Sequence, residues 1–308
     1  MNIVDVIIPV YKPDKEFFTL IDKLEKQTVP VRKIILMNTE QKYFDRLIYG
    51  TSFMEKYANI YVTHLSKREF DHGRTRNSGV KKSDADIFVM MTQDAIPVDE
   101  HLIEYLLQPL EEEKTAVSYA RQMPTKNSGE IERFTRKFNY PEKSMVKSRK
   151  DIKTLGIKTY FCSNVCAAYK REIFDSLGGF VKHTIFNEDM LYAAKAVKAG
   201  YQIAYAAEAK VLHSHNYTGR QQFKRNFDLG VSQAEHPEVF QGLLSESEGA
   251  NLVKKTASYL WSCGQKRKIF HLYINSICKY AGYILGRHYK LLPKAFIMKC
   301  TSNRDYWR

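Results

Sequence analysis

The chain has 308 residues, of which 44% are hydrophobic and 13% aromatic, so it can build a large core and is not a disordered protein. Its formal net charge of +14 is unevenly placed, because residues 251–308 contain twelve basic residues and one acidic residue. We therefore expect any cationic function to belong to the last fifth of the chain.

The cysteines and the apolar runs indicate the cellular compartment of the protein. Five cysteines occur without a CxxC pair or a zinc-ligand spacing, which is typical of reduced thiols in a cytosolic protein. No apolar run reaches about 18 residues, the length that spans a bilayer, and the first residues lack the basic region of a signal peptide. We expect a cytoplasmic protein that does not cross a membrane.

The first third of the chain alternates β-branched runs with segments whose apolar residues recur at helical spacing. The predicted strands are 3–10, 31–37, 60–64 and 86–91, and the predicted helices are 16–27 and 74–82. Such strand-helix-strand units predict an α/β fold, a mostly parallel central sheet flanked by helices. Ligands of these sheets bind beyond the carboxyl ends of the strands, so we expect Tyr11, Asn38 and Asp94 to face one crevice.

The later sequence is less regular until its end. Residues 122–155 are polar and aperiodic, which predicts an excursion with short helices or a mobile loop. Beyond it, helices are predicted at 167–177 and 188–199, short strands at 203–206 and 209–212, and helices from 220 onward. We divide the chain into a catalytic domain at 1–220 and a basic helical C-terminal extension at 221–308.

Acidic residues supply the first candidate site. Asp94 follows a predicted strand, where its carboxylate can hold a divalent cation against a diphosphate or simply cap the turn before Pro97. Glu188 and Asp189 begin a predicted helix, where carboxylates also occur merely because they offset the helix dipole.

Histidines and arginines extend this site. His213 and His215 point to one face at a strand end and are either metal ligands or hydrogen-bonded structural histidines. Arg74 and Arg76 at a helix start suit a diphosphate, although a solvated basic turn has the same composition. The motifs GxGxxG and GxxxxGKS/T do not occur, which argues against dehydrogenases and P-loop enzymes.

Taken in order, these elements resemble the inverting family-2 glycosyltransferases of the GT-A fold. The matching motifs are Pro9-Val10-Tyr11, Asn38-Thr39-Glu40, Arg76-Asn77 with Gly79, Thr92-Gln93-Asp94-Ala95, Gly178-Gly179-Phe180, Asn187-Glu188-Asp189, Gly200-Tyr201 and His213. Asn38 stands where many members carry aspartate, and Gln93-Asp94 stands where paired aspartates are usual. The resemblance covers roughly residues 1–220.

The resemblance implies a role for each matched position. It implies that Asp189 is the general base with Glu188 beside it, and that Asp94 and His213, with His215 as a further candidate, hold Mg²⁺ or Mn²⁺. The residues it assigns to the nucleotide sugar are Pro9, Val10, Tyr11, Asn38, Thr39, Glu40, Arg74, Arg76, Asn77, Gln93 and Asp94. Asp189 would then deprotonate the acceptor hydroxyl in a single displacement that inverts the anomeric configuration.

A narrower similarity, to bacterial rhamnosyltransferases, concerns the donor and acceptor. It is carried by the sequences at 37–40, 70–77, 93–97 and 283–287. It implies transfer of L-rhamnose from dTDP-β-L-rhamnose to a lipid-linked cell-surface polysaccharide, and a UDP-hexose donor is the alternative.

The extension at 221–308 interleaves basic residues with aromatic and aliphatic ones. This pattern suits a helix lying on an anionic membrane surface, here the inner face of the cell membrane, or an ordinary solvated helix packed on the catalytic domain. The charge also suits a nucleic-acid-binding protein, but no recognised motif accompanies it, so we expect no nucleic acid partner. Nucleotidyl transfer on a similar sheet is the remaining enzymatic alternative.

Overall fold

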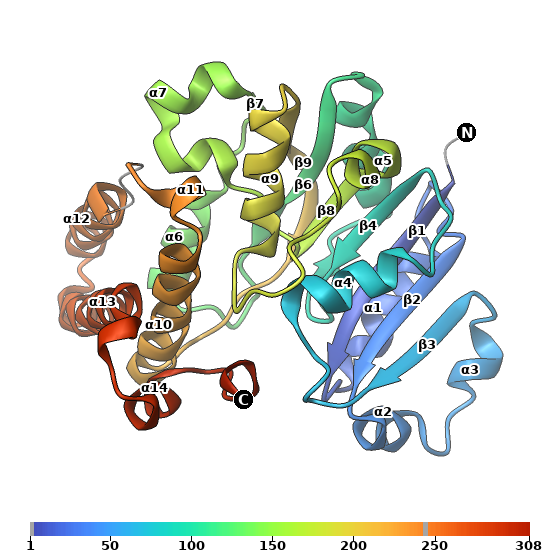
Figure 1. The fold of residues 1–308 in the computed structure, drawn as a ribbon, viewed down its shortest axis with the longest axis horizontal. Coiled ribbons are helices and arrows are strands. Elements are labelled where there is room, and N and C mark those ends of the chain that lie inside the picture. Colours follow the sequence, from blue (N-terminus) through green and yellow to red (C-terminus); the bar gives the residue numbers. More distant parts are fainter. Residues whose placement is uncertain (1–2, 243–245) are drawn as a thin grey trace.

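The structure, a computed structural model, describes residues 3–242 and 246–308. Within these ranges, nine strands form one mixed sheet in the order β3-β2-β1-β4-β8-β6-β9-β5, with β7 paired to β9 (Figure 1). The strands are β1 (Val4–Tyr11), β2 (Lys33–Thr39), β3 (Ile60–Leu65), β4 (Ile87–Met91), β5 (Ile96–Pro97), β6 (Thr115–Met123), β7 (Met145–Lys147), β8 (Cys166–Lys170) and β9 (Gln202–Leu212). The α/β class predicted from the sequence is confirmed.

Helices cover both faces of the sheet. Those before the last strand are α1 (Glu16–Glu25), α2 (Gln41–Ile48), α3 (Phe53–Lys56), α4 (His72–Val80), α5 (Leu102–Leu107), α6 (Glu130–Asn139), α7 (Ile152–Leu155), α8 (Arg171–Ser176) and α9 (Glu188–Lys198). Those after it are α10 (Gly219–Glu235), α11 (Pro237–Phe240), α12 (Glu246–Ser262), α13 (Lys266–Arg287) and α14 (Lys294–Cys300). Five short 3₁₀ segments complete the described chain, η1 (Gln108–Glu111), η2 (Arg149–Asp151), η3 (Gly156–Tyr160), η4 (Tyr289–Leu291) and η5 (Asp305–Trp307).

The N-terminal half of the sheet follows the predicted pattern. Strands β1, β2, β3 and β4 pair in parallel, so their carboxyl ends share one edge. Helix α1 packs on one face because Phe17, Leu20, Ile21 and Leu24 recur at helical spacing and are all buried. Two buried apolar clusters lie on the two sides of the sheet. They hold the strands in place, and polar residues gather at the carboxyl ends of these strands.

The segment 167–177 corrects a prediction. The sequence pattern predicts one helix there, but the structure has strand β8 followed by the short helix α8. Strand β8 lies between β4 and β6 and pairs antiparallel with both, so its alanines are buried on both faces, where a small-residue run imitates a helix pattern. Gly178 and Gly179 end α8 with positive φ, as their position after a helix predicts.

Two other regions differ from prediction in detail. The excursion at 122–155 holds the expected short helices, but it also contributes strand β7, which sequence patterning missed. The two short strands expected at 203–206 and 209–212 are one strand, β9, whose pairing with β6 shifts register between Ala120 and Arg121. Residues 207–209 of β9 are skipped in this pairing, and the irregularity interrupts the ladder with β6 without ending the strand.

Helices occupy the described chain from Gly219 onward, as predicted, except for the short connections between them. Helices α10 and α13 pack closely, because Gly230 on α10 and Gly282 and Gly286 on α13 bring the two backbones together without side chains between them. Figure 1 shows α10, α13 and α14 together on the side of the sheet away from β3. Among the described residues, no helix combines the length and apolar character that crossing a bilayer requires.

Candidate active site

The carboxyl edge of the sheet joins the ends of β1 and β4. The side chain of Gln93 accepts a hydrogen bond from the backbone N–H of Tyr11 at 2.8 Å and donates one to its carbonyl oxygen at 3.0 Å. The Tyr11 ring is partly exposed and meets Tyr43 edge to face, with centroids 5.7 Å apart. The side-chain ammonium of Lys12 lies 4.9 Å from the Tyr43 centroid. Gln93 therefore fixes an exposed aromatic surface next to Asp94.

The end of β2 presents polar groups that the protein itself leaves unpaired. Asn38 and Thr39 are buried, and neither Oδ1 of Asn38 nor Oγ1 of Thr39 has a hydrogen-bond partner among the described residues. The Asn38 amide contacts Nδ1 of His64 at 2.9 Å. Glu40 has a φ of 65°. Residues other than glycine adopt this left-handed backbone conformation at an energetic cost, and such residues cluster at binding sites.

Three side chains of the types that bind metals converge beside this edge. Asp94 follows β4, and His213 and His215 follow β9, yet their donor atoms all lie within 4.8 Å of one another. Oδ2 of Asp94 is 3.3 Å from Nε2 of His215 and 3.6 Å from Nε2 of His213, and the two imidazole nitrogens are 3.1 Å apart. Donors at about 2.0–2.2 Å from a common cation are separated by similar distances. The triad therefore fits one divalent cation and leaves its other positions open.

The hydrogen bonds of Gln122 prepare His213 for this role. Oε1 of Gln122 faces Nδ1 of His213 at 3.0 Å and also accepts from Arg136, while its amide nitrogen donates to Ser163 at 2.9 Å. Since the carbonyl oxygen of an amide accepts, Nδ1 of His213 carries a proton in both the charged and the neutral imidazole, and in the neutral form that binds a cation Nε2 keeps its lone pair. Gln122 thereby orients the imidazole with its free nitrogen toward Asp94.

The charges of the triad also suit a cation. Burial opposes ionisation of Asp94, but the hydrogen bond and charge of His213 outweigh it and hold the pKa of Asp94 well below its usual range. Burial, followed by repulsion from His213, lowers the pKa of His215 to about 4, so this imidazole is neutral at physiological pH. An ionised carboxylate and a neutral imidazole are the forms that bind metals.

A second pair of acids lies at the start of α9. Oδ2 of Asp189 accepts a hydrogen bond from the backbone N–H of Asn164 at 2.9 Å, and Oδ1 accepts from the N–H of Met190 at 2.8 Å. Burial, and then the charge of Glu188, raise the pKa of Asp189 to about 7. Asp189 keeps some solvent-accessible surface. A half-buried carboxylate with a raised pKa is suited to accept a proton near neutral pH.

Glu188 has a different environment from its neighbour. Its Oε1 lies 3.2 Å from Nε of Arg76 and 3.1 Å from Nδ2 of Asn164, and Oε2 lies 3.9 Å from Nδ1 of His72. Burial opposes its ionisation, but the charges of Arg76 and His72 outweigh it, so the pKa of Glu188 is lowered. Glu188 is a buried, paired anion, and its charge keeps the proton on Asp189 to a higher pH.

Residues 5–178 match the family described as Glycosyl transferase family 2. The chain belongs to this glycosyltransferase family. It is 38% identical over 308 residues to the O-antigen chain rhamnosyltransferase RfbN of Salmonella typhimurium, which covers 99% of this chain and 96% of the relative. It is 36% identical over 310 residues to the O-antigen chain rhamnosyltransferase WbaN of Salmonella anatum, with 98% and 95% covered.

Solved glycosyltransferases share the fold. The mannosyltransferase PcManGT from Pyrobaculum calidifontis, in complex with GDP-Man and Mn²⁺, superposes with a TM-score of 0.62 at 14% identity, covering 94% of this chain and 88% of that one. Residues 1–349 of S. aureus TarS in complex with UDP give a TM-score of 0.53 at 14% identity, with 94% and 91% covered. The fold is therefore GT-A, as the sequence motifs predicted.

Within this glycosyltransferase, the basic motif is arranged differently from a simple phosphate cradle. Arg76 is buried, and its guanidinium faces Glu188 and donates to the carbonyl oxygen of His72 at 3.0 Å. Asn77 exchanges two hydrogen bonds with the backbone of Phe180, at 2.9 and 3.1 Å. Arg76 thus ties α4 to the start of α9, and Asn77 ties it to the segment before α9. Arg74, by contrast, is exposed and donates to the carbonyl oxygen of Glu69.

The motif Pro9-Val10-Tyr11 presents mainly backbone atoms at the edge of the sheet. Val10 is buried in the core, and Pro9 is half-buried beside it, so of the three residues only Tyr11 presents an exposed side chain at the edge. The assignment of these positions to the nucleotide sugar remains a prediction that concerns their backbone.

Sequence reasoning did not assign the roles of two residues that organise the site. Asn164 contacts both carboxylates and accepts a hydrogen bond from Tyr169 at 2.7 Å, and Gln122 orients His213. Neither lies in a matched motif. A buried asparagine just before an apolar strand is the signal that points to Asn164, since a buried amide needs partners.

Proposed function

We propose that the protein is an inverting glycosyltransferase that moves L-rhamnose from dTDP-β-L-rhamnose to a hydroxyl of a cell-surface polysaccharide of the O-antigen kind. Full-length similarity to two O-antigen chain rhamnosyltransferases supports the sugar and the acceptor class. The single observation that carries the reaction is Asp189, a half-buried carboxylate with a pKa raised to about 7. A UDP-hexose is the competing donor.

Asp189 acts as the general base of a single displacement. Its carboxylate takes the proton of the acceptor hydroxyl while the hydroxyl oxygen bonds to the anomeric carbon and the bond from that carbon to the diphosphate breaks. One carboxylate suffices, because attack opposite the leaving group inverts the configuration without a covalent intermediate. Glu188 and Asn164 are positioning residues that hold Asp189 and set its pKa.

The leaving diphosphate needs positive charge near it. Asp94, His213 and His215 would hold a divalent cation, which when bound supplies charge stabilisation to the departing diphosphate. Two imidazole donors are unusual for Mg²⁺, which prefers oxygen ligands and ideal octahedral geometry. Of the two ions considered, the donor set favours Mn²⁺.

A donor panel tests this proposal. Hydrolysis and binding are measured for dTDP-rhamnose, UDP-sugars and GDP-sugars, each with Mg²⁺, Mn²⁺ or chelator. Saturable, Mn²⁺-enhanced use of dTDP-rhamnose supports the donor and the triad together. Preference for a UDP-sugar overturns the donor alone, and failure to bind any nucleotide sugar overturns the proposed reaction.

The proposed location is the cytoplasmic face of the cell membrane, where a lipid-linked acceptor would be met. A row of exposed apolar side chains along one face of α13 supports it: Phe270, Tyr273, Ile274, Ile277 and Tyr280. Phe270 and Ile277 are 69% and 67% exposed, and the exposed cations Lys266 and Arg267 lie at the start of the same helix. Apolar side chains flanked by cations suit an anionic bilayer surface.

Vesicle flotation tests the membrane proposal. The full chain is expected to float with vesicles containing anionic lipid, and the variants Phe270→Asp and Ile277→Asp are expected to float less. Tyr49→Asp is the matched control, because Tyr49 is 90% exposed but lies beyond α2, outside the helical extension. Equal flotation of all four proteins would overturn the role of α13.

A further inference from the structure

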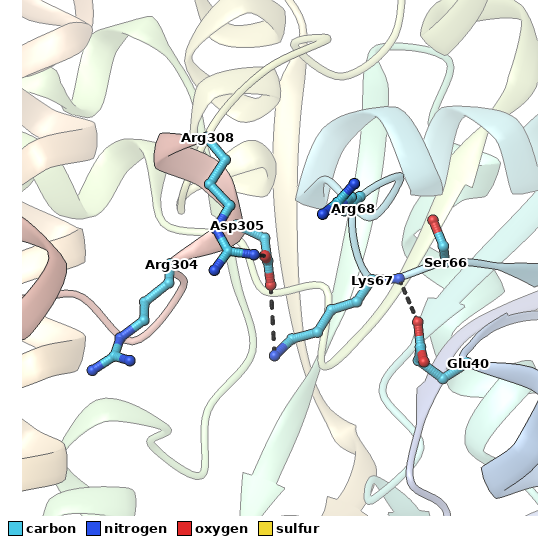
Figure 2. Close-up of a pocket in the computed structure, with 7 residues that line it drawn as sticks. All are labelled: Glu40, Ser66, Lys67, Arg68, Arg304, Asp305 and Arg308. Atoms are coloured by element: carbon cyan, nitrogen blue, oxygen red, sulfur yellow. Dashed lines mark hydrogen bonds and ion pairs between the residues drawn. The ribbon is translucent and has the colours of Figure 1, made fainter.

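A mixed-charge pocket of about 460 Å³ lies between the carboxyl edge of the sheet and the segment 303–308 (Figure 2). One wall comes from the ends of β2 and β3, and the other comes from the C-terminal segment. The lining residues are Glu40, Ser66, Lys67, Arg68, Arg304, Asp305 and Arg308. Segments that are far apart in sequence therefore share one cavity, and none of the matched family motifs except the one that contains Glu40 contributes to it.

The pocket holds four cations and two carboxylates, which are partly paired. Oε1 of Glu40 accepts a hydrogen bond from the backbone N–H of Lys67 at 2.8 Å. Asp305 lies 3.5 Å from Nζ of Lys67 and accepts from Arg308 at 3.0 Å. Arg68 makes no hydrogen bond or ion pair with the described part of the chain. Donor groups exceed acceptor groups around this cavity, so it suits a ligand with several acceptor oxygens.

The C-terminal segment is held firmly in this position. Asp228 on α10 accepts hydrogen bonds from Oγ1 of Thr301 at 2.6 Å and from the backbone N–H of Ser302 at 2.9 Å. The hydroxyl of Tyr306 donates to Glu235 at 2.8 Å, and its ring stacks on His183 with centroids 4.3 Å apart. Arg304 and Arg308 therefore stand on an anchored segment, and both remain exposed. Nε of Arg304 donates to the carbonyl oxygen of Met298 at 3.0 Å, which turns its guanidinium away from Glu40, while its two terminal nitrogens have no partner among the described residues (Figure 2).

The order of the strands indicates which end of the donor meets this pocket. The metal triad lies at the end of β4, and the pocket lies at the ends of β2 and β3, with Tyr11 of β1 between them. Three strand spacings separate β4 from β3, about 14 Å at ~4.8 Å each. With the diphosphate next to Asp94 and the transferred sugar at Asp189, as the proposed function has them, the nucleoside end of the donor extends toward Glu40 and the pocket.

We infer that segment 303–308 closes the nucleoside end of the donor site, and that Arg304 and Arg308 hydrogen-bond the nucleoside of the donor. This inference rests on the proposed function. Thymine offers two carbonyl acceptors on either side of one N–H donor, and the deoxyribose offers a hydroxyl. Guanidinium groups donate to the carbonyl oxygens, and Glu40 accepts from the N–H or the hydroxyl.

Binding of two probes tests this inference. The affinities of dTDP and of inorganic pyrophosphate, each with Mn²⁺, are measured by calorimetry for the full chain, Arg304→Ala, Arg308→Ala and Lys290→Ala. Lys290 is the matched control, because it is exposed on the same extension and does not line the pocket. Thermal melts establish that each variant is folded.

The expected result is that each arginine variant binds dTDP about tenfold or more weakly, as loss of a charged hydrogen bond predicts, while its pyrophosphate affinity is unchanged. Lys290→Ala is expected to match the unaltered chain with both probes. Unchanged dTDP affinity in both arginine variants overturns the inference. An equal loss for dTDP and pyrophosphate also overturns it, because the arginines then serve the diphosphate. If the unaltered chain binds neither dTDP nor UDP nor GDP, the proposed function itself fails.

Discussion

The backbone N–H of Asn164 donates a hydrogen bond to Oδ2 of Asp189 at 2.9 Å, and the same residue's amide donates to Glu188 at 3.1 Å. Two carboxylates adjacent in sequence are thus held by one residue from a distant segment. Arg76 faces Glu188 at 3.2 Å, so Glu188 ionises easily and its charge opposes ionisation of Asp189. Glu188 is therefore the anion of the pair, and Asp189 is a base that titrates near neutral pH.

Replacement of Asp189 by Asn should abolish most of the turnover. We expect kcat to fall about a hundredfold to ten-thousandfold, because general-base catalysis typically contributes that factor, while the KM for the donor changes little. The unaltered enzyme should lose activity as the pH falls below about 7, where Asp189 becomes protonated. Steady-state kinetics between pH 5.5 and 9 check both statements. An Asp189→Asn enzyme with near-normal kcat would remove Asp189 from the role of base.

The same variant should be more stable than the unaltered chain at high pH. Asp189 has a folded pKa of about 7 and an unfolded pKa of about 3.9, so the folded state binds more protons between these values. Its ionisation therefore costs stability as the pH rises through this window, and Asn escapes that cost. The difference in free energy of unfolding, measured with urea, should be small near pH 4.5 and favour Asp189→Asn at pH 8.

The control for this stability test is Asp45→Asn. Asp45 is exposed on α2 and makes no side-chain hydrogen bond with the described residues. Its replacement should leave stability nearly unchanged at both pH values. If Asp189→Asn is less stable than the unaltered chain at pH 8, the carboxylate is stabilising and its pKa is not raised.

Gln122→Leu should weaken metal binding without removing a ligand. The variant frees His213 from the hydrogen bond at Nδ1 that fixes its tautomer and orientation. Loss of such an outer partner typically costs about tenfold to a hundredfold in metal affinity. Mn²⁺ titration followed by electron paramagnetic resonance measures it, with His213→Ala as the complete loss. The control is Gln202→Leu, because Gln202 lies at the start of β9 whereas His213 follows its end. This variant should bind Mn²⁺ normally.

The sequence predicts the edge of the sheet that carries the site, but not which of the site residues contact one another. Strand β4 is apolar and is followed closely by Asp94, and that pattern alone locates a carboxylate at the carboxyl edge. The pairing of Arg76 with Glu188 is not readable, because it depends on how α4 packs against the start of α9. Strand β8 was predicted as a helix, since burial on both faces removes the alternation that identifies a strand. The contacts of Asn164, just before β8, with the two carboxylates were therefore not predicted.

The seam between α10 and α13 should tolerate no added methyl group. A Cβ on Gly286 would lie 2.0 Å from the carbonyl oxygen of Phe227, which is backbone and has no room to move. We expect Gly286→Ala to destabilise the protein by about 2 kcal/mol or more, as overpacking of a core does. Urea unfolding followed by circular dichroism measures this change.

Gly249 provides the matched control for Gly286→Ala, since it is also helical but has open space around its Cβ position among the described residues. Gly249→Ala should be neutral or stabilise by about 0.5–1 kcal/mol, because alanine is the better helix former. If the helices of the extension are docked on one another as the glycines indicate, only Gly286→Ala lowers the unfolding midpoint. Equal midpoints for the two variants would mean that α13 is not held against α10.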